Sequence, residues 1–281
     1  GEAVESFLNP KRIVIGAEEV LTREQVKTVF GNINADFLFM NPVSAEIVKH
    51  AINAFLATSL SFIYDIADIC EMVGADILDV SRALKSDPRI GEKAYLDASI
   101  GFSGGTLGRD LRVLLHEATI RHRELPVIRS VFRKNKERKK PMLHFLKTRL
   151  KNLKNKKIVV AGLTYKAGTS TLRRSLPLEI AEEVWKEGAY VGLYDAMVPE
   201  KDIKEAVRFP FSCEKTFLAS LEGAHACVII TPWDGLKKTD FKKMRAVMKS
   251  PAILFDARNF LASESEKIKK EGFCYRGVGR A

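Results

Sequence analysis

The feature that most constrains the fold is an uninterrupted stretch from Val43 to Val73 that contains neither glycine nor proline. Its apolar side chains recur at helical spacing among good helix formers, which predicts one long helix. Gly74 follows directly and is expected to end it. A helix that is apolar on so much of its surface needs more than one packing partner, and a homodimer interface supplies one most simply.

Two further helices are expected after Gly74. Residues 75–84 form one helical segment, and residues 109–123 form another after a glycine-rich loop at 101–105. Together with the long helix, they predict an all-helical central domain over residues 41–128, through which the chain would dimerise.

The beginning of the chain has a different pattern. Apolar runs at 12–17 and 36–40 predict strands, and residues 21–30 between them predict a helix with Thr22 as its cap. Two strands and one helix cannot close a hydrophobic core alone. We therefore expect residues 1–40 to be the truncated end of an α/β domain, and we favour a fragment of a longer protein over a naturally split or degenerate short form.

The last part, residues 157–281, alternates apolar strand-like runs with helical segments such as 178–187. The strands are expected at residues 157–163, 190–194, 227–230 and 253–255. This alternation predicts a Rossmann-like, doubly wound parallel sheet. The expected fold class of the whole chain is therefore α/β with an all-helical centre.

The net charge of +11 is concentrated in one stretch. Between Arg129 and Lys157 there are thirteen lysines and arginines against the single Glu137, a local balance of +12. Such a stretch is usually a solvated face, so we interpret residues 129–156 as a basic helix and linker and do not expect a nucleic-acid partner. Duplex binding with a steep salt dependence would support the opposite interpretation.

Composition excludes several other classes of protein. No run of eighteen apolar residues is present and the N-terminal residues lack the features of a signal peptide, so we expect a cytoplasmic protein without membrane contact. The four cysteines are widely spaced and have no histidine at metal-ligand spacing beside them. Neither a disulfide framework nor a metal site is therefore expected.

The turn after the first strand of the last domain, residues 162–168, contains glycines but lacks the GxGxxG spacing. That spacing lets the backbone approach a pyrophosphate at a helix N-terminus. This domain is therefore expected to bind a nucleotide in another way, with Lys166 and Arg173 near the carboxyl end of the strand, where ligands of open α/β sheets bind. Taken alone, the two cations are better explained as ordinary surface residues.

Several spaced motifs lie in one order along the chain. They are Asn9 to Gly16, Ala45 to Ala57, Asp87 to Gly91, Gly162 to Ser175, Thr231 to Asp234, Asp256 to Asn259 and Gly277 to Arg280. In order and spacing they resemble the UDP-glucose, UDP-N-acetylhexosamine and GDP-mannose dehydrogenase family over nearly the whole chain. The resemblance implies NAD-dependent oxidation of the C6 hydroxyl of a UDP-sugar, as in polysaccharide biosynthesis, and makes residues 1–40 the end of the NAD-binding domain and residues 157–281 the UDP-sugar-binding domain.

The resemblance also implies a set of catalytic residues. Lys49 and Asn53 are four positions apart and project from one helix face. In the family such a pair stabilises the negative charge that develops on the sugar C6 oxygen, a suitable role for a cation and an amide donor in a dry site. Asp110 matches the acid that helps to activate water or takes a proton. Without the surrounding motifs, we would interpret these residues as a solvated pair and a first-turn acid.

Further residues are expected to bind the substrate and the cofactor. Arg89 matches an arginine that reaches across the family dimer to the sugar of the neighbouring subunit, and Arg173 matches one that faces the NAD pyrophosphate. Bidentate pairing of guanidinium with phosphate suits such a role. The remaining expected substrate-binding residues are Tyr95, Leu96, Phe102, Gly104, Tyr165, Lys166 and Arg258. For the aromatic residues, core packing is the alternative explanation.

One position departs from the family pattern. The family has a catalytic cysteine after the glycine-rich loop, which holds the aldehyde as a thiohemiacetal and then as a thioester, whereas Thr106 stands at the matching place here. A threonine hydroxyl has a far higher pKa than a thiol and is a weak nucleophile without an adjacent base. A second oxidation step in this protein therefore cannot run through a thioester.

Several outcomes of this departure stay open. The complete protein would oxidise the alcohol by two electrons only, oxidise a hydrated aldehyde without a covalent intermediate, or use another nucleotide-sugar. The alternative from a different class is a non-catalytic nucleotide-sugar-binding or dimer-scaffolding protein. In each case we expect the chain alone to be inactive, because it lacks a complete binding site for the nicotinamide.

Overall fold

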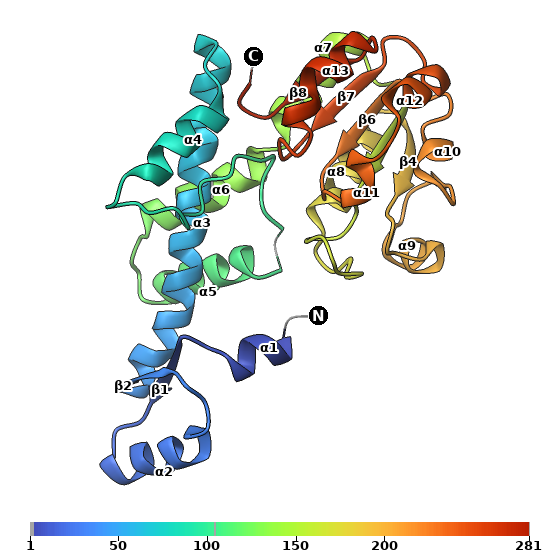
Figure 1. The fold of residues 1–281 in the computed structure, drawn as a ribbon. Coiled ribbons are helices and arrows are strands. Elements are labelled where there is room, and N and C mark those ends of the chain that lie inside the picture. The colour runs from blue at the N-terminus through green and yellow to red at the C-terminus, as the bar shows by residue number, and fades with distance from the viewer. Residues whose placement is uncertain (1–2, 104, 281) are drawn as a thin grey trace.

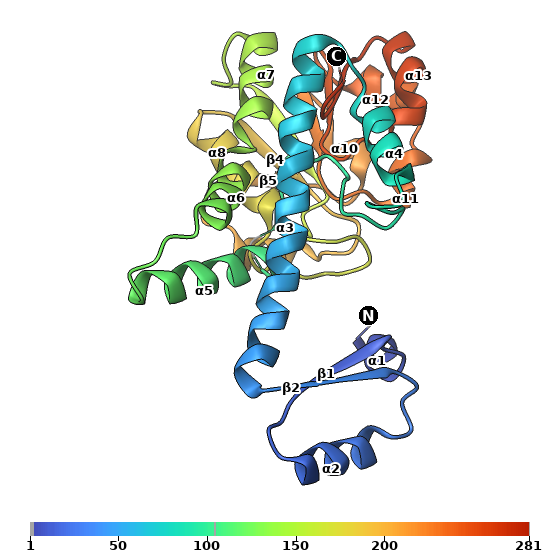
Figure 2. The ribbon, with the colours of Figure 1, turned by 90° about the vertical axis from the view of Figure 1, so that its left-hand side faces the viewer.

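The computed structural model describes residues 3–103 and 105–280 in three parts arranged along one long helix (Figure 1). A small unit with two strands lies at the beginning of this helix, further helices pack along its length, and a parallel sheet lies beside its second half. Figure 2 shows the helix running from the small unit along the sheet domain. The predicted fold class, α/β with an all-helical centre, is confirmed.

The N-terminal unit consists of α1 (Ala3–Leu8), β1 (Arg12–Gly16), α2 (Val20–Phe30) and β2 (Asp36–Met40). The two strands pair in parallel, as in the α/β domain end that the sequence predicts. The predicted cap at Thr22 is wrong, because the cap position is Glu19, three residues earlier, and Thr22 lies inside α2. Within the described part of the chain, no residue of α2 is buried.

The predicted long helix is α3 (Pro42–Val73), and both of its ends are capped. At its start, the Asn41 side chain accepts a hydrogen bond from the Ser44 amide at 2.8 Å, which satisfies one of the free amides of the first turn. At its end, Gly74 adopts a φ of 77°, and its amide donates to the carbonyl of Cys70. The prediction of one helix that ends at Gly74 is therefore confirmed.

One side of α3 is buried and the other side is open. Ala57 and Ala67 are fully buried, and their small side chains let neighbouring elements approach closely. On the open side, Phe55 is 72% exposed and Phe62 is 48% exposed. By length and composition, α3 is the one described helix that could cross a membrane, a property that core helices of other proteins share. An apolar face of this kind is typical of an interaction surface.

Four shorter helices complete the helical part. They are α4 (Ile77–Ser86), α5 (Leu107–Ile120), α6 (Pro126–Glu137) and α7 (Lys140–Leu150). The helices predicted at 75–84 and 109–123 are present as α4 and α5, with ends that differ by two or three residues. α4 begins after Asp76 because this side chain accepts a hydrogen bond from the Leu78 amide at 2.9 Å.

The basic stretch at 129–156 forms most of α6 and all of α7, and it packs against α3. Arg138 is 3% exposed and forms an ion pair with Asp68 of α3. Lys134 pairs with Asp65 at 2.5 Å and with Asp68 at 2.7 Å. The boundary expected between residues 128 and 129 falls inside α6, so no break in secondary structure marks it. These cations hold α6 against α3.

The sheet domain has six parallel strands, of which the sequence predicted four. They are β3 (Lys157–Ala161), β4 (Tyr190–Tyr194), β5 (Phe211–Cys213), β6 (Ala226–Ile229), β7 (Ile253–Asp256) and β8 (Cys274–Gly277). Their order in the sheet is β5-β4-β3-β6-β7-β8. Because the order reverses between β3 and β6, the carboxyl ends of these strands mark the switch point at which doubly wound sheets bind ligands.

Helices cover both faces of this sheet (Figure 1). Ile158 of β3 packs in the same core as Ile180 of α8, whereas Val159 packs with Met244 of α12 in the core of the other face. A strand buried on both faces is apolar throughout, which is why β3 could be predicted from the sequence. The helices are α8 (Leu176–Lys186), α9 (Glu200–Ala206), α10 (Phe217–Ser220), α11 (Asp234–Lys237), α12 (Phe241–Val247), η1 (Ala262–Glu264) and α13 (Ser265–Lys270).

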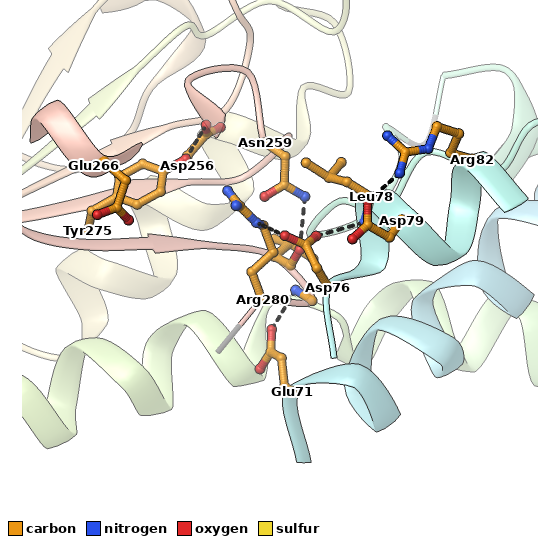
Figure 3. Close-up of polar contacts among 12 residues, drawn as sticks. Glu71, Asp76, Leu78, Asp79, Arg82, Asp256, Asn259, Glu266, Tyr275 and Arg280 are labelled. Carbon is orange, nitrogen blue, oxygen red and sulfur yellow. Dashed lines mark hydrogen bonds and ion pairs between the residues drawn. The ribbon is translucent and has the colours of Figure 1, made fainter. Parts of the chain in front are cut away.

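The end of the sheet domain docks on the turn between α3 and α4 (Figure 3). Glu71 accepts a hydrogen bond from the Gly279 amide at 2.7 Å and pairs with Arg276 at 3.1 Å. Asp76 accepts a hydrogen bond from Arg280 at 2.8 Å. Two carboxylates and two guanidinium groups therefore tie the sheet domain to the helical part.

Replacing Glu71 by alanine is expected to lower the free energy of unfolding by about 2 kcal/mol, because charge-assisted hydrogen bonds at a largely buried contact are lost. Urea unfolding followed by circular dichroism measures this change. In the control Glu266→Ala, which removes an exposed ion pair with Lys269, the change should stay below about 0.5 kcal/mol. Equal shifts in the two variants would contradict the role of Glu71.

Candidate functional site

Asn53 on α3 and Asp110 on α5 are in direct contact. The amide of Asn53 donates a hydrogen bond to the carboxylate of Asp110, whose side chain is 0% exposed. Lys49 lies one turn before Asn53, and its side chain is exposed. The structure therefore joins two predicted catalytic residues that are far apart in sequence and places the third on the same face of α3.

The carboxylate of Asp110 is surrounded by cationic and donor groups. Nε of Arg109 donates to Oδ1 of Asp110 at 3.2 Å, and Nδ1 of His50 lies 3.5 Å from the same oxygen. Burial opposes ionisation of this carboxyl, but the hydrogen bonds from Asn53 and Arg109 outweigh it, so the pKa of Asp110 is lowered. Asp110 is thus an ionised proton acceptor at neutral pH.

The glycine-rich loop precedes Asp110 and is held by α6. Nδ2 of Asn135 donates to the carbonyl of Phe102 at 2.9 Å, and the Phe102 amide donates to Oδ1 of Asn135 at 2.8 Å. Phe102 is buried, and Gly104 lies outside the described residues. Thr106 follows at the start of α5 with an exposed side chain, and its carbonyl accepts the Asp110 amide at 3.1 Å. The loop therefore leads directly into the turn that carries Asp110.

The same loop touches the sheet domain. Oγ of Ser103 accepts a hydrogen bond from the amide of Leu176, the first residue of α8, at 3.2 Å. A Cβ added to Gly105 would lie 4.0 Å from the carbonyl oxygen of Arg173. Arg173, the expected cofactor-binding residue, is exposed. The loop that ends at Thr106 and the segment that carries Arg173 are thus neighbours across the two domains.

Tyr165 and Lys166 lie on the turn after β3, at the switch point of the sheet. Both side chains are exposed, and the Lys166 carbonyl accepts hydrogen bonds from the hydroxyls of Thr164 at 3.0 Å and Thr169 at 2.8 Å. The turn is anchored by Asp195, which accepts the Leu163 amide at 2.6 Å. These contacts fix the backbone of the turn and leave the expected substrate-binding side chains at its surface.

Arg258 lies in the segment that follows β7. Asp256 accepts the Arg258 amide at 3.2 Å. It also accepts the hydroxyl of Tyr275 at 3.0 Å (Figure 3). The side chain of Arg258 is exposed, and its charge is close enough to lower the pKa of Tyr64 on α3, against the larger upward effect of burial. Arg258 therefore lies on the side of the sheet domain that faces the long helix.

The other expected residues of the helical part surround a groove of about 920 Å³. Arg89, Tyr95 and Leu96 line it together with Phe55 of α3. Phe55 is two positions after Asn53, which corresponds to about 200° around a helix. The groove and Asn53 are thus on different sides of α3. In the described part of one chain, these three residues are not brought together with Asn53.

Sequence reasoning missed four residues that contact the site. His50 and Arg109 are adjacent in sequence to predicted residues, so their positions offered a weak signal. Ser103 lies between two predicted residues and offered the same weak signal, whereas Asn135 offered none, because its partner is set by the packing of distant elements. Among the described residues, no group of three or more histidine, cysteine, aspartate or glutamate side chains is placed to hold a metal ion.

Comparison with known sequences agrees with this arrangement. The UDP-glucose/GDP-mannose dehydrogenase family, central domain, matches residues 43–137, and the UDP binding domain of the same family matches residues 159–263. The chain is 34% identical to the UDP-glucose 6-dehydrogenase of Rickettsia bellii over 283 residues and 32% identical to that of Bacillus subtilis over 281 residues. These alignments include 99% and 100% of this chain but 64% and 60% of the relatives, so the chain spans less than two thirds of their length.

Solved structures of the same kind superpose on the chain. A UDP-glucose dehydrogenase from Pyrobaculum islandicum gives a TM-score of 0.88 at 27% identity and covers 99% of this chain and 61% of its own. A UDP-D-ManNAc dehydrogenase from Pyrococcus horikoshii, at 23% identity, shares the fold with a TM-score of 0.83, over 100% of this chain and 62% of its own. Both matched family domains are present in the order of the family, so the chain belongs to the UDP-glucose/GDP-mannose dehydrogenase family.

Proposed function

We propose that the complete protein oxidises the C6 hydroxyl of a UDP-sugar with NAD, and that this chain supplies the catalytic helices and the nucleotide-sugar-binding domain. The observation that carries this proposal is the contact between Asn53 and Asp110 beside the loop that ends at Thr106. Relatives that are named UDP-glucose 6-dehydrogenase support the substrate class. The product would be a donor for polysaccharide biosynthesis.

The proposed chemistry assigns a step to each catalytic residue. Asp110, whose pKa is lowered, takes the proton of the C6 hydroxyl directly or through a water molecule. Lys49 and Asn53 stabilise the negative charge on the C6 oxygen. Bound NAD would supply the acceptor for the hydride that leaves C6. The backbone of Arg173 lies beside the loop, and its exposed side chain carries a guanidinium that suits the pyrophosphate of NAD.

The remaining expected residues would bind the nucleotide-sugar. Lys166 and Arg258 would provide cations for the diphosphate, and the exposed ring of Tyr165 would provide aromatic surface beside Lys166, whereas the buried Phe102 would act through the shape of the glycine-rich loop. Support comes from the position of Lys166 and Tyr165 at the switch point of the sheet. Gly104, which lies outside the described residues, stays a proposed substrate-binding residue, and so do Leu96 and Tyr95, which line the groove beside α3.

We further propose that oxidation does not proceed through a thioester. Thr106 offers a hydroxyl at the position expected for the nucleophile. Burial raises the pKa of the Cys70, Cys213 and Cys227 thiols, which makes each a poor source of thiolate at neutral pH. The reaction would then stop at the aldehyde, after two electrons, or continue on its hydrate.

The stoichiometry of the reaction distinguishes these two outcomes, because release of the aldehyde yields one NADH per sugar and oxidation of its hydrate yields a second. The complete protein is mixed with a limiting amount of UDP-glucose and excess NAD, and NADH is counted by its absorbance. One NADH per sugar is expected. Two per sugar would contradict the two-electron step, and none with any UDP-hexose tried would contradict catalysis.

The second candidate is a nucleotide-sugar-binding or scaffolding protein without chemistry, which Thr106 favours. It predicts UDP binding by calorimetry without NADH formation. Turnover that Lys49→Ala abolishes would eliminate this candidate.

A homodimer is part of the proposal. The open side of α3 carries Phe55 and Phe62 beside the groove that Arg89 and Tyr95 line. A symmetric partner on this face would bury the exposed aromatic surface. It would also bring Arg89 of one protomer towards the site of the other. This arrangement is favoured because the groove that Arg89 lines lies on the side of α3 away from Asn53 of the same chain.

A further inference from the structure

The glycine-rich loop has no regular secondary structure from Gly101 to Ser103, yet its backbone is fixed at one residue by a single side chain. Asn135 of α6 donates to the Phe102 carbonyl at 2.9 Å and accepts from the Phe102 amide at 2.8 Å. Both backbone polar groups of Phe102 are thus satisfied by one amide, in the manner of a neighbouring strand. We refer to this pair of bonds as the Asn135 clamp.

The clamp depends on a close approach at the preceding residue. Gly101 adopts a φ of 123°, and a Cβ there would lie 3.0 Å from Oδ1 of Asn135 and 3.2 Å from Leu176 of the sheet domain. Only glycine combines this backbone conformation with this proximity. The loop is therefore pressed between α6 on one side and α8 on the other.

A second bond joins the loop to the sheet domain. The amide of Leu176 begins α8 and has no partner within its own helix, and it donates to Oγ of Ser103 at 3.2 Å. The loop thus bridges the two domains, with the Asn135 clamp on the helical side and Ser103 on the side of the expected nucleotide-sugar site. Three residues after Ser103, Thr106 begins the turn that carries Asp110.

We propose that Asn135 is a positioning residue, which sets the loop so that Thr106 and Asp110 meet the reacting carbon of a substrate held by the sheet domain. This inference rests on the proposed function. Asn135 acts through the backbone of Phe102 and not by contact with substrate. Displacement of a catalytic group by about 1 Å costs up to about 100-fold in rate, which is the scale at which such a clamp matters.

The test uses Asn135→Asp in the complete protein. The substitution keeps the size of the side chain and an acceptor for the Phe102 amide, but turns a carboxylate oxygen towards the Phe102 carbonyl. We expect kcat for NADH formation to fall about 10-fold to 100-fold while KM for UDP-glucose changes less than about threefold. Amide hydrogen exchange of the loop peptide should become faster. The control is Asn152→Asp at an exposed asparagine, which should change neither quantity.

Each outcome decides the proposal. Faster loop exchange with an unchanged kcat would overturn the positioning role, and unchanged exchange would overturn the clamp itself. If the unaltered protein forms no NADH, the proposed function fails, and the clamp is then decided by loop exchange alone. Should Asn135→Asp not fold, Ser103→Ala tests the other anchor of the loop: it removes only the bond to Leu176, and a smaller loss of kcat at constant KM is expected, about threefold to tenfold.

Discussion

Replacing Asp110 by asparagine is expected to lower the turnover of the complete protein by about 10²-fold to 10⁴-fold, the usual contribution of a positioned general base. The side chain is 0% exposed and its pKa is lowered, so it is an ionised acceptor at neutral pH. Asparagine has nearly the same shape, and its single amide oxygen can still accept from either Asn53 or Arg109, which donate to different oxygens of Asp110. The folded structure should therefore persist while the proton acceptor is lost.

Three measurements separate chemistry from folding in this variant. NADH formation gives the rate, calorimetry with UDP gives nucleotide binding, and thermal unfolding gives stability. UDP binding should be unchanged, because the expected diphosphate contacts come from Lys166 and Arg258. The matched control is Asp79→Asn, at an exposed residue of α4 that pairs with Arg82, and it should keep full turnover. Full turnover in Asp110→Asn would remove the general-base assignment.

The elements that the sequence predicted well are those whose pattern is set locally. α3 is apolar at helical spacing and capped by its own neighbours, and β4 was predicted with its exact ends. The two missed strands, β5 and β8, are the edges of the sheet. Each pairs on one side only and contains a polar residue, Ser212 or Arg276, so neither shows the continuous apolar run of a central strand.

The candidate site was predictable in the same uneven way. The shared face of Lys49 and Asn53 follows from helix geometry, because they are four positions apart. The contact between Asn53 and Asp110 depends on how α5 crosses α3, which no local spacing determines. The Asn135 clamp is harder still to predict. Asn135 lies among the lysines and arginines of the basic stretch, and nothing in that pattern indicates that its side chain binds the backbone of Phe102.

The largest effect on stability is expected from Gly162→Ala at the end of β3. Gly162 adopts a φ of 82°, and a Cβ there would lie 2.1 Å from the carbonyl oxygen of Thr231 and 2.6 Å from its nitrogen. These are backbone atoms at the end of β6, next to β3 in the sheet, so neither partner can rotate away. Overpacking and the left-handed conformation together are expected to cost about 3–5 kcal/mol, a large part of a domain's stability.

A second glycine of the same turn isolates the cause. Gly168 has a similar φ of 78°, but a Cβ there would meet nothing within 4 Å. Gly168→Ala should therefore cost only the conformational strain, about 1 kcal/mol. The difference between the urea midpoints of the two variants measures the close contact between the turn and Thr231. Equal losses of unfolding free energy in the two variants would mean that backbone strain alone explains the need for glycine at 162. The close approach of Gly162 to Thr231 would then add nothing to the cost of the substitution.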